Sequence, residues 1–184
     1  MLQSRVYQLS ARANDSNADD FQNFSHAAYK TLPAEVLLDA ISDCTGVPEK
    51  FNGWPEGYRA VQVWDNRMPS YFFRIFGRPV RASVCECERS GEPSIAQSLH
   101  LLNSPEIMAK VQHRHGKARQ LANSDLTCDA IIDELYLCML SRLPSSDERS
   151  LMLQAFDGID ADRLAAVEDV QWALLNSKEF IFNH

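Results

Sequence analysis

Two cysteines separated by a single residue, Cys85 and Cys87, lie in the stretch of this sequence that carries the most reactive side chains. Residues 76–89 also contain two carboxylates and three arginines. Two thiols at this spacing can bind a metal ion, form a strained disulfide, or fill space in a core. The residue types alone leave all three alternatives open.

A metal site here would need ligands from elsewhere in the chain. His100, in the helix expected to follow, is a candidate because thiolates together with imidazole suit zinc, copper or iron. A structural zinc site needs four ligands, so Glu86 or Glu88 would have to be the fourth. Cys85, Cys87 and His100 are therefore the candidate metal site. The structural alternative is buried thiols with the carboxylates paired to arginine.

The three arginines of this segment are Arg78, Arg81 and Arg89. A guanidinium offers a planar fork of donors that can hold a carboxylate, sulfate or phosphate. The alternative is internal salt bridges, either with the carboxylates of the same segment or with the acidic pair Asp133 and Glu134.

No catalytic motif is present. The chain lacks a Gly-x-Ser-x-Gly elbow, a His-Glu-x-x-His pair, a phosphate-binding P-loop and a Gly-x-Gly-x-x-Gly turn. It also lacks Cys-x-x-Cys-His, so we expect no haem attached to this chain, and a transition metal is the one cofactor to consider. The sequence predicts a protein that is not an enzyme.

The simplest interpretation of the remaining cysteines and of the aromatic residues is that they belong to the hydrophobic core. Free cysteine is among the most buried residue types, which predicts that Cys44, Cys128 and Cys138 are small buried hydrophobes. Six aromatic residues either fill the core or line a platform for sugars, and a platform would suit an accessory to polysaccharide processing. They are Trp54, Tyr58, Trp64, Tyr71, Phe72 and Phe73.

Composition limits the class of protein. The chain has 184 residues, 45% of them apolar, which is enough for a core, and its net charge of −7 argues against a nucleic-acid partner. Its longest unbroken apolar run, 135–140, is far shorter than the roughly 20 residues that cross a bilayer. We therefore expect no membrane insertion. No secretion signal is recognisable at the start, which taken literally indicates the cytoplasm.

Hydrophobic periodicity predicts a mainly α fold of irregular helices, with short extended segments near 58–64 and 80–87. We expect a single domain over 1–184, with a polar loop at 11–25, an irregular segment at 46–92 and a helical part at 93–184. In the helix that opens after Pro93, the apolar stripe is predicted to be Ile95, Leu99 and Leu102. A second helix, about 128–142, points Ile131 and Leu135 inward.

One pattern occurs twice. Residues 101–107 and 174–180 both read as a helix end, an Asn-Ser turn and a new helix with an apolar residue in its first turn. We interpret the pair as one helix–turn–helix device used at two places.

Several motifs in a fixed order resemble a known family. They are Tyr7-Gln8-Leu9-Ser10, Leu32-Pro33-Ala34-Glu35-Val36, Thr45-Gly46-Val47-Pro48, Phe76-Gly77-Arg78-Pro79, Cys85-Glu86-Cys87-Glu88-Arg89, Leu99-His100-Leu101-Leu102-Asn103-Ser104, Ile131-Ile132-Asp133-Glu134-Leu135 and Trp172-Ala173-Leu174-Leu175-Asn176-Ser177. Together they span nearly the whole chain. The chain resembles the planctomycete C-terminal surface-protein domain, domain of unknown function 1553.

The resemblance implies a structural or interaction module without a known activity, so no catalytic residue carries over. Members usually lie at the C-terminus of large exported proteins and commonly follow a cytochrome-c-like haem module. The expected partners are therefore other domains or chains of a haem-bearing surface protein. The chain would correspond to the C-terminal portion of a larger family domain, and its localisation stays open. The alternative function is a metal-binding or redox accessory module that uses Cys85 and Cys87.

Overall fold

The computed structural model describes residues 3–5, 8–9, 12–20, 22–27, 30–64, 69–79, 94–157 and 162–183. These residues form a mainly α-helical protein, which confirms the predicted fold class. Two short strands occur among them. β1 (Lys30–Thr31) pairs antiparallel with β2 (Phe182–Asn183), with Thr31 opposite Phe182. The start and the end of the helical part are therefore joined.

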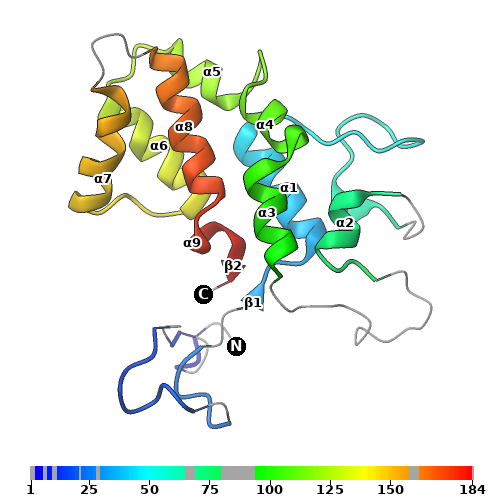
Figure 1. Ribbon diagram of the computed structural model, residues 1–184, viewed down its shortest axis with the longest axis vertical. Coiled ribbons are helices and arrows are strands. Elements are labelled where there is room, and N and C mark those ends of the chain that lie inside the picture. The colour runs from blue at the N-terminus through cyan, green and yellow to red at the C-terminus, as the bar shows by residue number, and fades with distance from the viewer. Residues whose placement is uncertain are drawn as a thin grey trace.

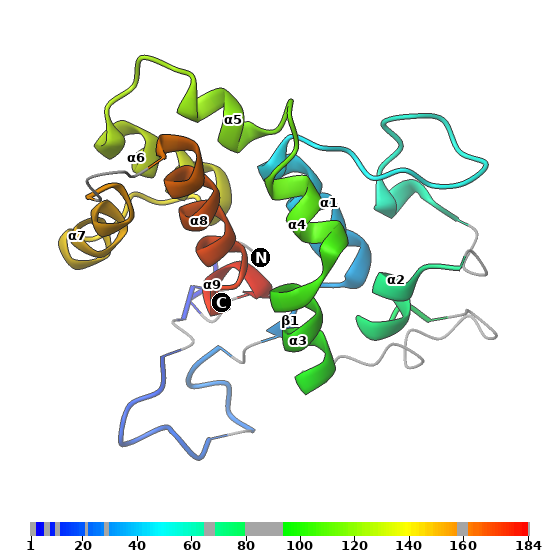
Figure 2. The same ribbon diagram turned by 45° about the horizontal axis from the view of Figure 1, so that its top comes forward.

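The helices follow one another with short connections in the second half of the chain (Figure 1). In chain order they are α1 (Ala34–Thr45), the 3-10 turn η1 (Ala60–Gln62), α2 (Tyr71–Ile75), α3 (Ile95–Asn103), α4 (Pro105–Val111), α5 (Lys117–Ala122), α6 (Cys128–Leu140), α7 (Ser146–Leu153), the 3-10 turn η3 (Gln154–Phe156), α8 (Arg163–Leu175) and α9 (Lys178–Ile181). Helices α6, α7 and α8 lie together on one side, whereas α1, α3 and α4 form the middle with α2 at the far edge (Figures 1 and 2).

Helix α1 has the spacing of apolar residues that is typical of an amphipathic helix. Leu37, Ile41 and Cys44 share one buried face. Glu35 lies in the first turn, where its negative charge interacts favourably with the positive end of the helix dipole. The helix ends at Gly46, whose φ of 69° lies in the left-handed region that glycine adopts without strain.

Within 58–64, where the sequence predicts a short extended segment, Ala60–Gln62 form the 3-10 turn η1 instead, between extended Arg59 and Val63. The cause is the buried carboxylate of Asp39 on α1. Its Oδ1 accepts a hydrogen bond from Ala60 N at 2.6 Å and its Oδ2 accepts one from Val61 N at 3.2 Å. Backbone donors that a strand would need for a ladder are therefore bound to a side chain. The other predicted extended segment, 80–87, lies outside the described residues.

Helix α3 carries the predicted apolar stripe on its exposed side. Ile95 is 81% exposed, Leu99 53% and Leu102 42%. The buried face carries Leu101 and Gln97 instead. Gln97 turns inward because its Nε2 donates to the carbonyl of Ile75 at the end of α2, at 3.1 Å. A polar residue that satisfies a buried carbonyl thus decides the orientation of the helix.

The repeated Asn-Ser device has the same hydrogen bonds at both places. Ser104 accepts from Ile107 N at 3.4 Å, and Ser177 accepts from Phe180 N at 3.2 Å. The preceding asparagines both donate to the carbonyl four residues earlier, at 3.1 Å for Asn103 and 2.8 Å for Asn176. Each serine is the N-cap of the second helix, α4 or α9.

An arginine joins three elements near the end of the chain. Arg142, just after α6, forms two hydrogen bonds with Glu148 of α7, at 2.7 and 2.8 Å, and two with Glu179 of α9, both at 2.6 Å. Bidentate pairs of this kind are stronger than single ion pairs. The bonds from Arg142 lower the pKa of Glu148 to about 2.

Replacing Glu148 by Gln tests this network. Because the folded-state pKa lies below the ordinary value of 4.5, the carboxylate stabilises the protein above pH 4.5, and that stabilisation is lost as the pH falls toward about 2. Gln keeps the capping role toward Ser145 and removes the charge. We expect E148Q to lose about 1 kcal/mol of unfolding free energy at neutral pH, a value discounted for partial exposure.

Urea unfolding across the acid range measures the difference between wild type and E148Q, which should shrink toward zero near pH 2. The adjacent exposed acid provides the control, since Asp147→Asn leaves the Arg142 bonds intact. A difference that stays constant with pH would contradict the assignment.

Candidate functional site

Two of the predicted site residues, His100 and Arg78, lie in the described part of the chain. Cys85, Cys87, Arg81 and Arg89 lie outside it, as do Glu86 and Glu88. Within the described part, no group of three or more His, Cys, Asp or Glu residues could hold a metal ion.

His100 lies on α3 against the aromatic side chains of α2. Its ring centroid is 5.3 Å from that of Tyr71, 5.7 Å from Phe72 and 6.2 Å from Phe76. Its Nε2 is buried and has no hydrogen-bond partner among the described residues. Burial lowers the pKa of His100, and the nearby Glu106 opposes that shift in part. The imidazole is therefore held in its neutral form, which is the form that ligates metals.

Arg78 is enclosed by three partners. Its side chain is 5% exposed, its Nε lies 3.2 Å from Glu35 Oε1, and its guanidinium lies 4.3 Å from the centre of the Phe73 ring. Its Nη2 also donates to the carbonyl of Val63. The guanidinium thus links the start of α1 to the segments that flank α2.

The acidic residues Asp133 and Glu134 bind other cations than Arg78. Asp133 accepts a hydrogen bond from Arg149, and Glu134 accepts one from Lys117 at 2.8 Å. Both pairs lie on α6 and its neighbours, on the far side of α1 from α2 (Figure 2).

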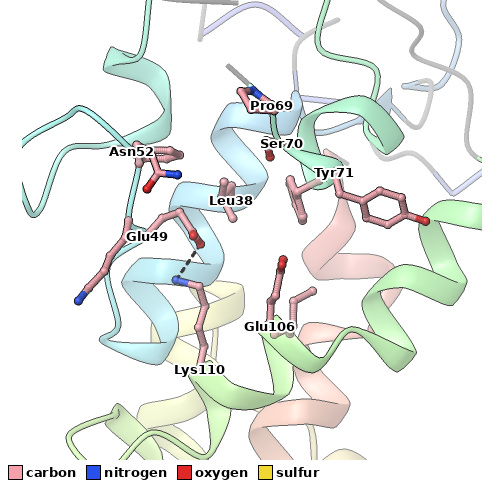
Figure 3. A pocket seen from close by; sticks show the side chains of 12 residues that line it. Leu38, Glu49, Asn52, Pro69, Ser70, Tyr71, Glu106 and Lys110 are labelled. Carbon is pink, nitrogen blue, oxygen red and sulfur yellow. Dashed lines mark ion pairs between the residues drawn. The ribbon is translucent and has the colours of Figure 1, made fainter. Parts of the chain in front are cut away.

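A pocket of about 200 Å³ opens between α1, α2 and α4 (Figure 3). The buried part of its apolar lining consists of Leu38, Phe51, Phe72 and Ile107. The lining residues are Leu38, Glu49, Lys50, Phe51, Asn52, Pro69, Ser70, Tyr71, Phe72, Glu106, Ile107 and Lys110. Pockets for drug-sized molecules are larger, so this space suits a small group or a single side chain.

Lys110 is the buried one of the two lysines that line this pocket, and its ammonium already has partners within the chain. Nζ lies 3.2 Å from Glu49 Oε2, 3.2 Å from Ser42 Oγ and 2.8 Å from the carbonyl of Val47. An ammonium has three donors, and these three contacts account for them. A substrate anion would have to displace one of these partners, so the position serves structure.

Sequence reasoning missed the role of Lys110. It stands in a basic stretch that reads as a solvated surface, yet the residue is 8% exposed. Its partners on and after α1 are more than 60 residues away in the chain. No local pattern marks a lysine that binds a distant helix end.

Glu106 has no ion-pair partner among the described residues, and in Figure 3 its carboxylate points over the apolar lining. Ser70 is used as the N-cap of α2, where it accepts from Phe73 N at 3.3 Å. Glu49 is paired with Lys110, so the pocket offers the carboxylate of Glu106 above an apolar surface and, among its described lining residues, no activated hydroxyl. This arrangement fits packing or binding of a small group, and it lacks the nucleophile–base pair of a hydrolase.

The aromatic residues divide between core and surface. Phe72 and Phe73 are buried, whereas Trp64 is 76% and Tyr71 55% exposed. Trp54 packs edge-on against Trp64, with ring centroids 5.7 Å apart, and tilted against Tyr58 at 4.9 Å. The accessory role in polysaccharide processing stays a prediction.

No helix within the described ranges is long and apolar enough to span a bilayer.

Replacing His100 by Phe tests whether its ring serves packing alone. Because burial lowers its pKa below the ordinary value of 6.5, His100 costs stability as the pH falls below 6.5. A phenyl ring takes up no proton, so it removes this destabilisation at low pH, and it has no buried nitrogen that needs a hydrogen-bond partner. We expect H100F to unfold at an equal or higher temperature at neutral pH, and to lose less stability than wild type on acidification.

Thermal unfolding at several pH values provides the measurement, with His113→Gln, at an exposed position, as the control. A loss of more than about 2 kcal/mol in H100F at neutral pH would mean that Nε2 has a partner whose removal is costly.

The sequence of this chain matches one known protein family. The family described as "Protein of unknown function (DUF1553)" matches residues 1–156. A search among curated proteins and among solved structures found no match. The match covers most of the chain and agrees with the family that the ordered motifs resemble. The chain belongs to the DUF1553 family of proteins of unknown function.

Proposed function

We propose that this chain is a non-catalytic structural and interaction module of a larger surface-type planctomycete protein. In this role it docks against the haem-bearing or other domains of that protein. The observation that carries the proposal is the row of exposed apolar side chains on α3, Ile95, Leu99 and Leu102, which we call the α3 apolar face.

The α3 apolar face has the spacing of a docking surface. Its residues stand at positions i, i+4 and i+7, which lie on one side of a helix. Stable interfaces combine an apolar centre with a polar rim and bury about 800 Å² on each partner. Three apolar side chains on one helix would supply the centre of such an area.

The repeated Asn-Ser device offers an internal comparison. Leu102 before the first device corresponds to Leu175 before the second. Leu175 is 2% exposed, whereas Leu102 is 42% exposed. In the same local structure, the leucine directly before the asparagine is therefore buried in α8 and exposed in α3. A partner that packs on α3 as the neighbours of α8 pack on Leu175 would bury the exposed copy.

The charged interior supports a role without catalysis. The ammonium of Lys110 and the guanidinium groups of Arg78 and Arg142 all bind carboxylates of the same chain. Groups held in this way stabilise the fold and are not free to bind a substrate. The haem-bearing partner comes from the resemblance to the family, whose members commonly carry a cytochrome-c-like module.

Leu99→Glu tests the docking role. The chain and a separately produced cytochrome-c-like module from a family member are mixed and sedimented, with detection at the haem absorption band. We expect co-sedimentation with the wild type and a loss of at least tenfold in affinity with L99E, because a buried charge without a partner opposes association.

The matched control is Leu151→Glu on α7, since Leu151 is exposed to a similar degree, 59%. It should bind as the wild type does, and both variants should unfold near the wild-type temperature. Equal binding by L99E and L151E, or no binding by the wild type, would reject docking through this face.

A second candidate function is a metal-binding or redox accessory module that uses Cys85 and Cys87. The buried, neutral imidazole of His100 favours it, because Nε2 has no hydrogen-bond partner among the described residues and is available as a ligand. The two cysteines lie outside those residues, so the idea rests on residue types and on the state of His100.

Metal analysis of the purified chain tests this candidate. We expect one equivalent of a transition metal, lost in a Cys85→Ser, Cys87→Ser double variant and reduced in H100F. Loss in the double variant together with retention in a Cys128→Ser control would support it. A metal-free chain after loading with zinc, followed by gel filtration, would exclude it.

A further inference from the structure

Cys44 and Cys138 come together from positions 94 residues apart in the chain. Cys44 lies in the last turn of α1, and Cys138 lies in the last turn of α6. Cys44 Sγ donates a hydrogen bond to the backbone carbonyl of Cys138 at 3.4 Å, which places the two thiols close enough to influence each other's pKa. Residues that look like separate core cysteines in the sequence thus form a dithiol between two helices.

The two thiols differ in access. Cys44 is 5% exposed, whereas Cys138 is only partly buried. A small solute can therefore reach the sulfur of Cys138 first, and the sulfur of Cys44 stands behind it. This is the order of an attacking and a resolving cysteine.

The surrounding charges favour a thiolate at the accessible position. The hydrogen bond from Cys44 and the ammonium of Lys117 lower the pKa of Cys138, while burial, Glu134 and Asp43 oppose that shift. The same hydrogen bond and burial raise the pKa of Cys44. Lys117 is held in place by Glu134, one turn before Cys138 on α6, at 2.8 Å. These effects favour the proton on Cys44 and the negative charge on the more accessible Cys138.

We propose that Cys44 and Cys138 form a reversible redox site that reacts with a hydroperoxide and closes to a disulfide between α1 and α6. The Cys138 thiolate attacks one oxygen of the peroxide and breaks the O–O bond. Its sulfur becomes a sulfenic acid, and the leaving hydroxide or alkoxide takes up a proton. Cys44 sulfur then attacks the sulfenic sulfur, which forms the S–S bond and breaks the S–O bond.

The second leaving group is hydroxide, which departs as water with the proton of Cys44. In sum, two thiols and one hydrogen peroxide give one disulfide and two waters, and two electrons pass from sulfur to oxygen. A dithiol reductant reverses the change by thiol–disulfide exchange. The disulfide would join the ends of α1 and α6 covalently across a long loop, which stabilises the folded chain.

The test uses the full chain, reduced, desalted and treated with hydrogen peroxide under native conditions. Peptide mass spectrometry without reduction should find the Cys44 peptide linked to the Cys138 peptide. The melting temperature should rise by roughly 10 °C and return to its first value with dithiothreitol. In Cys44→Ser, dimedone should trap a sulfenic acid on Cys138, which cannot resolve.

Cys128→Ser is the matched control, since Cys128 is partly buried on the same helix, and this variant should still form the linkage. Lys117→Met should slow alkylation of Cys138 several-fold, whereas Lys117→Arg should not. The proposal is overturned if Cys138 stays a thiol while Cys128 is modified. It is also overturned if oxidation links neither Cys44 nor Cys138 in a chain that circular dichroism shows to be folded.

Discussion

The backbone carbonyls at the C-terminal end of α1 constrain the packing of the rest of the described chain. A buried helix end leaves acceptors without partners inside the helix, and these must be satisfied from elsewhere. Here α4 and α8 supply the donors. Lys110 binds the carbonyl of Val47 at 2.8 Å, and Gln171, which is fully buried, binds the carbonyl of Cys44 at 2.9 Å. The positive charge of Lys110 also suits the negative end of the helix dipole.

Close approach at this end requires small residues. A side chain at Gly116 would place its Cβ 3.3 Å from the carbonyl of Thr45 and 3.1 Å from that of His113, which is tighter than ordinary contact. Gly46 turns the chain at the same place, and Lys117, the first residue of α5, packs beside it. The ends of α1 and α4 and the start of α5 thus meet at one point because glycine allows their backbones to approach, and α8 reaches the same point through the side chain of Gln171.

Local patterns in the sequence predict those parts of the fold that depend on neighbours in the chain. The apolar face of α1, the glycine that ends it and the paired Asn-Ser turns all follow from spacing and capping. A 3-10 turn replaces part of the extended segment expected near 58–64, and α3 exposes its apolar stripe, because Asp39 and Gln97 bind backbone groups about 20 residues away. The predicted cysteine and arginine site lies mostly outside the described residues, and the partners of Lys110 depend on tertiary contact that no local signal encodes.

The pair Cys44 and Cys138 lies at this same C-terminal end of α1. Besides its buried apolar face, α1 is held to the helices around it by hydrogen bonds at its C-terminal end, those of Lys110 and Gln171 among them. A covalent bond between Cys44 and Cys138 would add a link to these non-covalent contacts. It would fix α1 against α6 without changing the surface of α3, since α3 meets the core through Gln97 and Leu101 on its other face. The proposed docking and the proposed thiol chemistry would therefore be separable, because one uses the exposed face of α3 and the other the C-terminal ends of α1 and α6.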